Sequence, residues 1–447
     1  MKTIRALAAE LQAGQTTSVK LVEQALERIS AYRGQGGAAY VSVDADRALA
    51  SARASDAARA AGNVPSLLAG LPVSIKDLFD VQGEVTAAGS RALADAQAAQ
   101  ADAPVVARLR HAGAVLLGRT NMSEFAFSGL GLNPHYGTPR NPLDDARVSG
   151  GSTSGGAVSV ASDMAVMALG TDTGGSIRIP SAFCGLTGFK PTARRVSLDG
   201  AVPLSTTLDS AGPLARSVDC CAIADAILSG ETLATDAVPL AGLRFGVTED
   251  FVNDGMDETV RAAFEAALSR LQKAGALIQR FAFPELKELP SINVGGGFSA
   301  AESWAWHRGL LEHAGDKYDQ RVAVRIRRGA QQSAADYIDL LAARRHLIAQ
   351  AERRLAVFDA WLMPTVPVVP PLLQPLQDSD ETFFATNGLV LRNPGVINFL
   401  DGCALNLPCP SDSKLPVGIS ICGRRGEDAH VLAIGRAVEA LLHGAQG

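Results

Sequence analysis

Residues 150–178 read GGSTSGGAVSVASDMAVMALGTDTGGSIR and place two glycine-flanked serines, Ser152 and Ser176, on either side of an apolar run, VMALG at 166–170. A short apolar run of this length is typical of a buried strand. A glycine-rich turn directly after it is typical of a strand-to-helix connection, because glycine allows the backbone to turn tightly. The stretch therefore favours an α/β protein with polar side chains at the end of a strand.

The rest of the chain repeats this alternation of short apolar runs and helical periods. The expected strands are LPVSI (71–75), AVLLG (114–118), VMALG (166–170), LRFGV (243–247), AWLMP (360–364) and PVGISI (416–421), and the expected helices cover 102–113, 217–229, 257–275, 331–356 and 427–442. Such alternation predicts a mixed, mostly parallel central sheet covered by helices on both faces. Large α/β enzymes can reach 447 residues around one sheet, so we expect a single domain over 1–447.

Four segments are expected within this domain: an N-terminal helical segment (1–62), a motif-bearing core (65–220), a variable substrate-side region (230–395) and a closing strand and helix (396–447). The N-terminal helices, over about 18–29 and 44–62, are expected to serve packing or a homodimer contact. The proline-rich stretch 363–377 predicts an extended loop. Together with the glycine-interrupted segment 290–310, the loops expected over 363–395 are predicted to set specificity.

Composition excludes several function classes. Hydrophobic residues make up 47% and charged residues 19%, which is typical of a folded globular chain, and the net charge of −5 argues against nucleic acid or an anionic membrane as a partner. No apolar run approaches the roughly 20 residues of a membrane span. The six cysteines form no CxxC pair and no cluster with histidine, which predicts neither a metal site nor a disulfide framework. We expect a cytoplasmic protein without metal or cofactor.

A lone lysine, Lys76, lies in the apolar run LPVSIKDLF upstream of the two serines. Burial lowers the pKa of a lysine, so a neutral amine could act as the base that a serine nucleophile needs. The alternatives are structural: Lys76 could pair with Asp77 or reach water, Ser152 could cap the following helix, and Ser176 could belong to an ordinary turn. The sequence does not predict a Ser-His-Asp hydrolase, because none of its seven histidines is accompanied by a GxSxG nucleophile motif.

The order Lys76, Ser152, Ser176, with GGSTSGG and TDTGGSIRIPSAFCGLTGFKPT around the serines, resembles the amidase signature family of serine hydrolases. The resemblance covers roughly 65–220 and resumes in ALNLPCPSDSKLPVGISICGRRGEDAHVLAIG (404–435). It implies that Ser176 is the nucleophile, that Lys76 is the base, and that Ser152, reached through a cis peptide bond, relays the proton between them.

The resemblance also implies roles for neighbouring groups. Expected oxyanion donors are the backbone amides of Thr173, Gly174, Gly175 and Ser176. Supporting contacts are expected from Ser154, Thr171, Asp172 and Arg178, and substrate contacts from Asn121, Met122 and Phe125. Apart from the resemblance, Trp304 is expected, like Phe125, either to line an apolar substrate pocket or to belong to the core. Ser154 and Thr171 should hydrogen-bond the lysine and the cis-serine. Asp172 should buttress the turn, and Arg178 should either do the same or face the substrate.

Three functions follow from the resemblance. The first is a stand-alone hydrolase of a small-molecule amide, aryl amide or carbamate, acting through an acyl-enzyme. The second is the glutamine-hydrolysing component of an amidotransferase, which acts with partner subunits on aminoacyl-tRNA; the chain has DKYDQRVAVRIRRGA at 316–330 in place of that component's YDGxRYG-type segment. The third is a catalytically silent binding protein, which the presence of all three triad residues disfavours.

Overall fold

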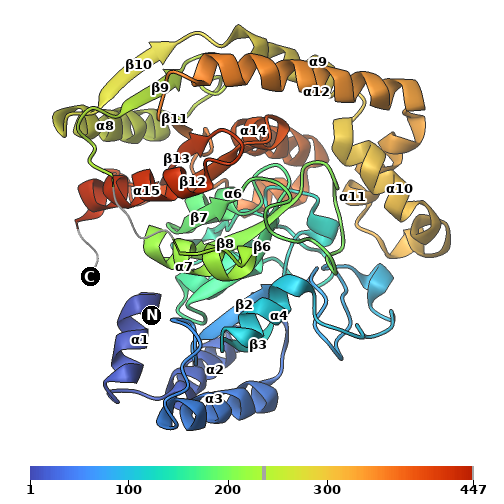
Figure 1. Cartoon of the computed structure of the whole chain (residues 1–447). Helices are drawn as coiled ribbons and strands as arrows, with labels where there is room; N and C mark the ends of the chain where they lie inside the picture. Colours follow the sequence, from blue (N-terminus) through green and yellow to red (C-terminus); the bar gives the residue numbers. More distant parts are fainter. Residues whose placement is uncertain (234–237, 445–447) are drawn as a thin grey trace.

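An 11-stranded sheet forms the centre of the molecule (Figure 1), with the strand order β1-β3-β2-β6-β8-β7-β12-β13-β11-β9-β10. The computed structural model describes residues 1–233 and 238–444. The strands of this sheet are β1 Tyr40–Val43, β2 Pro72–Lys76, β3 Val115–Thr120, β6 Met167–Asp172, β7 Thr187–Lys190, β8 Ser210–Ala215, β9 Arg244–Thr248, β10 Leu277–Phe281, β11 Ala360–Pro364, β12 Cys403–Cys409 and β13 Val417–Gly423. A small separate sheet pairs β4 Arg140–Asn141 with β5 Asp144–Val148.

Helices connect these strands. Their bounds are α1 Ile4–Gln12, α2 Ser18–Gly34, α3 Ala45–Ala60, α4 Pro104–His111, α5 Ser154–Ala161, α6 Arg178–Phe183, α7 Val218–Ser229, α8 Glu258–Lys273, α9 Leu289–Ile292, α10 Gly297–Ala314, α11 Gln320–Arg327, α12 Ala334–Leu355, α13 Leu373–Asp378, α14 Asp380–Phe399 and α15 Asp428–His443. Every strand and helix predicted from the periodicity is present within a few residues of its expected bounds.

Parallel pairing is confined to two blocks of the mixed sheet. One block is β3–β2–β6 and the other is β11–β9–β10. The run between them, from β6 through β8, β7, β12 and β13 to β11, is antiparallel. Part of this run follows from connection length, because the seven residues 410–416 between β12 and β13 are too few for a crossover and close a hairpin.

Helices pack on both faces of the sheet, as expected for an α/β domain. Along β6, Met167 and Leu169 join the apolar cluster that contains Cys221 of α7. Ala168, between them, joins a different cluster with Ala157 of α5. Since successive side chains of a strand point to opposite faces, α7 and α5 cover opposite faces of β6.

Two segments predicted to be loops are largely helical. Within 290–310 the chain forms α10, and within 363–395 it forms α13 and most of α14, so only 365–372 is the extended, proline-rich connection. Ser379 begins α14 by accepting a hydrogen bond from the backbone N–H of Thr382 at 3.1 Å. Glycine and proline interruptions therefore misled the prediction here, because capping and packing of a long helix outweigh single unfavourable residues.

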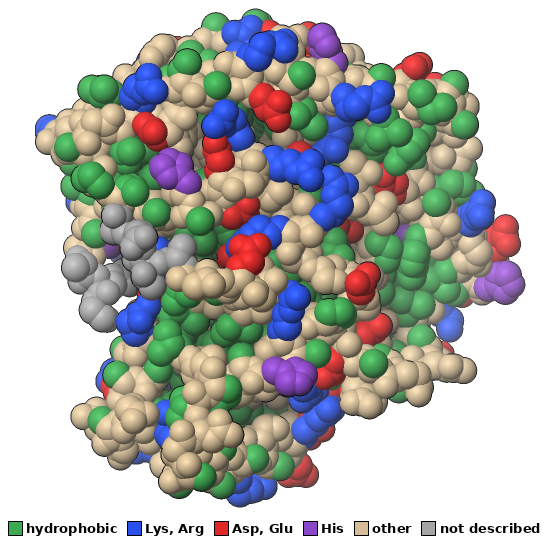
Figure 2. Space-filling view, in the orientation of Figure 1, with side chains coloured by type: hydrophobic (Ala, Val, Ile, Leu, Met, Phe, Trp, Pro, Cys, Tyr) green, Lys and Arg blue, Asp and Glu red, His purple; other side chains and the backbone are tan. Residues whose placement is uncertain are grey.

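The face of the molecule in Figure 2 mixes basic and acidic side chains. This agrees with the small net charge of the sequence. Among the described residues, no helix combines the length and the apolar character that crossing a membrane requires.

Candidate active site

Lys76 is the last residue of β2 and lies beside the carboxyl end of the parallel strand β6. Because parallel strands present their carboxyl ends at the same edge of a sheet, Lys76 and Thr171 meet there. Lys76 Nζ donates hydrogen bonds to Ser152 Oγ at 2.7 Å and to Thr171 Oγ1 at 2.8 Å. The side chain is completely buried. The structure thus brings the predicted base and relay serine into direct contact.

Burial lowers the pKa of Lys76 to about 7, against the opposing effect of the negative charges of Asp172 and Asp209. The alternative pairing with Asp77 is not formed. Asp77 instead accepts hydrogen bonds from Arg119 at 3.2 Å and from the backbone N–H of Gly89 at 2.9 Å. A substantial fraction of Lys76 is therefore neutral near pH 7, as a general base must be.

Ser152 lies immediately before α5, and the Gly151–Ser152 peptide bond is cis, as the resemblance implied. Thr153, not Ser152, occupies the N-cap position of α5. The backbone N–H of Thr153 donates to the carbonyl oxygen of Ser176 at 3.2 Å. The segment that carries Ser152 is therefore joined directly to the turn that carries Ser176. The helix-cap role considered for Ser152 is not formed, and Thr153 at the N-cap position makes no side-chain capping hydrogen bond either.

Ser176 follows a turn in which Gly175 has a positive φ of 128°. A Cβ atom at Gly175 would approach Ile179 Cδ1 and Pro394 Cγ to 2.6 Å each, so a larger residue does not fit. The N–H of Gly175 donates to Asp172 Oδ1 at 2.8 Å. That bond corrects the expectation for the oxyanion hole at Gly175, which shapes the turn. The other three expected donors, Thr173, Gly174 and Ser176, have backbone N–H groups with no acceptor among the described residues.

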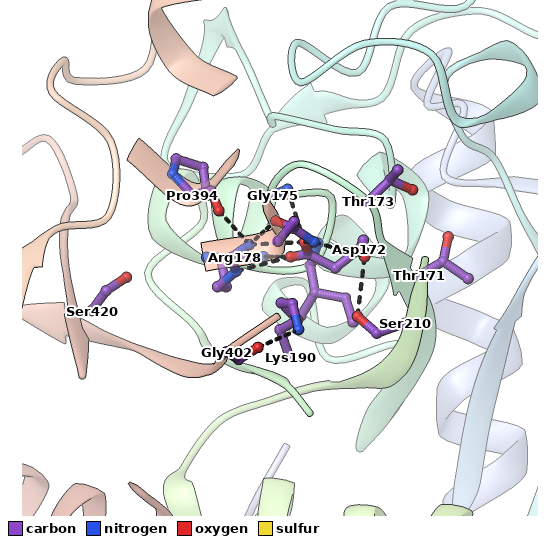
Figure 3. A network of polar contacts seen from close by, with 12 residues as sticks. Thr171, Asp172, Thr173, Gly175, Arg178, Lys190, Ser210, Pro394, Gly402 and Ser420 are labelled. Atoms are coloured by element: carbon purple, nitrogen blue, oxygen red, sulfur yellow. Dashed lines mark hydrogen bonds and ion pairs between the residues drawn. The ribbon is translucent and has the colours of Figure 1, made fainter. Parts of the chain in front are cut away.

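Asp172 and Arg178 form a buried ion pair beneath this turn (Figure 3), in which Arg178 Nε and Nη2 reach the carboxylate at 3.0 and 2.9 Å. Arg178 also donates to the carbonyl of Pro394 at 3.0 Å and to Asn398 Oδ1 at 2.6 Å. Burial alone would raise the pKa of Asp172, but the charge and hydrogen bonds of Arg178 hold it well below its usual range. Arg178 is completely buried and buttresses the turn; it does not face the cavity.

Replacing Asp172 with alanine is expected to lower the free energy of unfolding by about 3–5 kcal/mol, because Arg178 would remain buried without a counter-charge. The carboxylate contributes this stability fully above the unfolded-state pKa of about 4, and loses it as the pH falls towards its depressed folded-state pKa. Urea unfolding of wild type and variant should therefore differ most at neutral pH and converge below about pH 4. An unchanged midpoint at pH 7 would contradict the role assigned to this pair.

A cavity of about 750 Å³ opens beside Ser176. Its described lining contains no histidine, which agrees with a lysine base. The lining comes from the turn after β6, from 126–128, from the segment around α9 and α10, and from α11 and α14: Ala126, Phe127, Ser128, Thr173, Gly174, Ser176, Leu204, Leu208, Phe251, Leu289, Pro290, Asn293, Gly296, Ser299, Ala300, Arg325, Arg328, Asn387, Gly388, Leu389, Leu391, Arg392, Gly395, Val396 and Phe399.

The four residues expected to contact substrate lie outside this lining. Asn121 is buried and connects two backbone segments, because its side-chain amide donates to the carbonyls of Ala38 at 2.9 Å and Gly137 at 2.7 Å. Met122 is a core residue. Phe125 packs its ring against His307 and Tyr318, and Trp304 packs against the main apolar core.

Ser154 also differs from its expected role. Its hydroxyl is buried and has no hydrogen-bond partner among the described residues, so it bonds neither Lys76 nor Ser152. Thr171 makes the expected contact with Lys76.

Sequence reasoning missed the part that α14 plays. Asn398 Nδ2 donates to Asp172 Oδ1 at 2.9 Å and to the Asp172 carbonyl at 3.1 Å. Asp209 accepts hydrogen bonds from Thr173 Oγ1 and from the backbone amides of Leu204 and Ser205. Neither position stands in a motif that periodicity could reveal. The one sequence signal was a buried-type asparagine in the apolar segment VINFL at 396–400.

Comparison with known proteins agrees with this geometry, since the Amidase family model matches residues 20–432. The chain belongs to the amidase family. Its relatives include a 2-amino-5-chloromuconic acid deaminase of Comamonas testosteroni, 38% identical over 97% of this chain and 95% of that protein. Another is a glutamyl-tRNA(Gln) amidotransferase component of Koribacter versatilis, 33% identical over 98% of both. A solved amidase crystal structure matches with a TM-score of 0.89 at 35% identity, over 99% of this chain and 100% of that one.

This amidase is therefore an enzyme that hydrolyses C–N bonds. The expected fold class is confirmed, and the site lies where an α/β sheet usually places one, at the carboxyl ends of its parallel strands.

Proposed function

We propose that the protein is a stand-alone hydrolase that cleaves a carboxylic amide or a related C–N bond through Lys76, Ser152 and Ser176. The observation that carries this proposal is the 2.7 Å hydrogen bond from the buried Lys76 amine to Ser152 Oγ. A buried lysine bonded to a serine beside a substrate-sized cavity provides a base without histidine. The Thr153–Ser176 backbone hydrogen bond supports the placement of Ser176 next to this pair.

In the proposed first step, neutral Lys76 accepts a proton from Ser152 as Ser152 accepts one from Ser176. Ser176 Oγ then bonds to the substrate carbonyl carbon, and the oxygen of the tetrahedral intermediate takes the negative charge. The N–H groups of Gly174 and Ser176 are the proposed donors to that oxygen. Such preorganised donors are worth roughly 10²–10³ in rate each.

In the second step, the C–N bond breaks and the proton held by Lys76 returns through Ser152 to the leaving nitrogen. This protonation is needed because an amide anion is a very poor leaving group. The acyl group stays on Ser176 as an ester. Water then gives a proton through Ser152 to Lys76 as its oxygen attacks the ester carbon. The bond between that carbon and Ser176 Oγ breaks, Ser176 Oγ takes the proton back through Ser152, and the acid is released.

Glutamine hydrolysis within an amidotransferase complex remains a second candidate, because several relatives are named as components of glutamyl-tRNA(Gln) amidotransferase. That role requires partner subunits and glutamine as the ammonia source. The two roles can be distinguished by measuring ammonia release from glutamine. The measurement is made on the purified chain with and without co-purified partners. Partner-dependent glutaminase activity would favour the second.

Fluorophosphonate labelling tests the proposed nucleophile. Such a probe is expected to modify Ser176 alone, because an activated serine reacts and an ordinary serine does not. Peptide mapping by mass spectrometry identifies the modified residue. Ser299→Ala is the matched control, since Ser299 lines the same cavity, and it should keep full labelling. Labelling at another serine, or labelling that persists in Ser176→Ala, would overturn the assignment.

A further inference from the structure

The cavity beside Ser176 has an unbalanced charge. Three arginines line it, Arg325, Arg328 and Arg392. None of the described residues that line it is Asp or Glu, so the lining side chains carry a formal charge of +3. The chain as a whole has a net charge of −5. The excess of positive charge is therefore a local property of the cavity and points to the chemistry of its occupant.

Arg392 is already engaged by the protein. Its Nε donates to Asn393 Oδ1 at 3.0 Å, its Nη2 to the carbonyl of Val252 at 2.7 Å, and its Nη1 to the carbonyl of Asp254. These contacts fix α14 to the segment after β9. Arg392 therefore contributes charge to the cavity, but each of its three nitrogens already donates one hydrogen bond to the protein.

Arg325 and Arg328 have donors to spare. They lie three residues apart, at the end of α11 and just after it, a spacing that puts side chains on one face of a helix. Arg325 uses Nε on the Arg321 carbonyl at 2.8 Å and Nη2 on the Phe127 carbonyl at 3.3 Å, and its Nη1 has no partner among the described residues.

Within the described chain, the side chain of Arg328 forms no hydrogen bond or ion pair, and only its backbone N–H is bonded, to the carbonyls of Arg325 and Ile326. It also borders a neighbouring hollow with Asp336 and Asp339, without pairing with either.

The surroundings of Arg325 hold its guanidinium without neutralising it. The rings of Phe127 and Phe383 lie 5.4 and 5.8 Å from the guanidinium carbon. Burial lowers the pKa of Arg325 to about 10, and the group stays charged at neutral pH. Its neighbour Arg321, in contrast, pairs with Asp380 at 2.6 Å. The charge of Asp319 acts on Arg325, but no described carboxylate forms an ion pair with it. A mostly buried guanidinium without such a pair is costly unless a ligand supplies the missing charge, and a carboxylate matches its geometry.

We propose that the acyl part of the substrate carries a carboxylate that binds Arg325 and Arg328, and that it carries no ammonium group. The substrate class is then the monoamide, or related C–N compound, of a dicarboxylic acid. This rests on the proposed function, because Ser176 must attack the other end of the same acyl chain. The exclusion of ammonium follows from the lining, which offers no acidic side chain among the described residues.

Three amides of similar size test the proposal on the purified protein: glutaramate, which is anionic; pentanamide, which is neutral; and glutamine, which adds an ammonium group. The expected order of kcat/KM places glutaramate about 10- to 100-fold above each of the other two, the range that a charge-assisted hydrogen bond supplies. Ammonia release is measured at constant pH and ionic strength.

Variants assign the preference to the arginines. Arg325→Gln should lower kcat/KM for glutaramate about 10- to 100-fold while changing that for pentanamide less than about threefold, and Arg328→Gln should act in the same direction. Arg327→Gln is the matched control, because Arg327 lies in the same helix, is exposed and does not line the cavity. Equal losses on both substrates would indicate a structural role and overturn the proposal, as would a wild-type preference for pentanamide or glutamine.

A binding measurement separates this inference from the proposed function. Glutarate, a dicarboxylate that cannot be hydrolysed, should raise the melting temperature of the wild type and of Arg327→Gln, but not that of Arg325→Gln or Arg328→Gln. If no amide is hydrolysed but glutarate still protects in an arginine-dependent way, the proposed reaction fails and the carboxylate site stands. If amides are hydrolysed but glutarate does not raise the melting temperature and glutaramate is not preferred over pentanamide, the carboxylate site is wrong and the proposed function stands.

Discussion

Replacing Ser176 with alanine is expected to reduce kcat by roughly four orders of magnitude or more, because loss of the nucleophile removes the covalent route. The variant should fold normally. The Ser176 side chain lines the cavity, and the Thr153 contact uses its backbone carbonyl, which alanine retains.

Amide hydrolysis at saturating substrate, together with urea unfolding, measures both parts of this expectation.

Ser152→Ala should reduce kcat by a comparable factor, since members of a catalytic triad act as a unit and their losses are not additive. The double variant should therefore be little slower than either single variant. Near wild-type activity in Ser176→Ala would remove the central claim of the mechanism.

Replacing Lys76 with methionine is expected to reduce kcat/KM by roughly 10²–10⁴, the usual contribution of a general base. In the wild type, the pKa of Lys76 lies near 7 through burial, so the neutral form and the rate should both increase as the pH rises through about 7. Activity should then stay high into the alkaline range. The methionine variant should lose this rise, because it has no amine to deprotonate.

Stability provides an independent check on Lys76. A lysine whose pKa is lower in the folded chain than in the unfolded chain reduces the free energy of unfolding, because the unfolded chain binds the proton more strongly. This penalty is complete below the folded-state pKa and disappears as the pH rises to the unfolded-state pKa. Lys76→Met should therefore raise the free energy of unfolding at pH 6–7 relative to wild type, and this gain should shrink towards pH 10. An acid optimum near pH 5, or a pH profile that Lys76→Met leaves unchanged, would exclude Lys76 as the base.

The sequence correctly predicted the strands and helices that have strong local signals. The apolar runs at 71–75 and 166–170 became β2 and β6, and the long periodic segment 331–356 became α12, because strand and helix periodicity are local properties of the chain. The contact between Lys76 and Ser152 was reached through resemblance and not through periodicity.

The sequence by itself determined that Lys76 and Thr171 each directly follow an apolar run that forms a strand, whereas the contact between the two side chains was implied by the resemblance. Tertiary structure alone decided the strand order, the antiparallel pairings other than the short β12–β13 hairpin, and the cavity wall. The wall joins Ser176 to Pro290 and Leu391, which lie more than a hundred residues away in the chain. Long-range pairing leaves no local pattern, because its energy comes from burial shared between distant segments. For the same reason, three features emerge only once the chain is folded: the depressed pKa of Lys76, the buttressing role of Arg178, and an Arg325 side chain that has no ion-pair partner among the described residues.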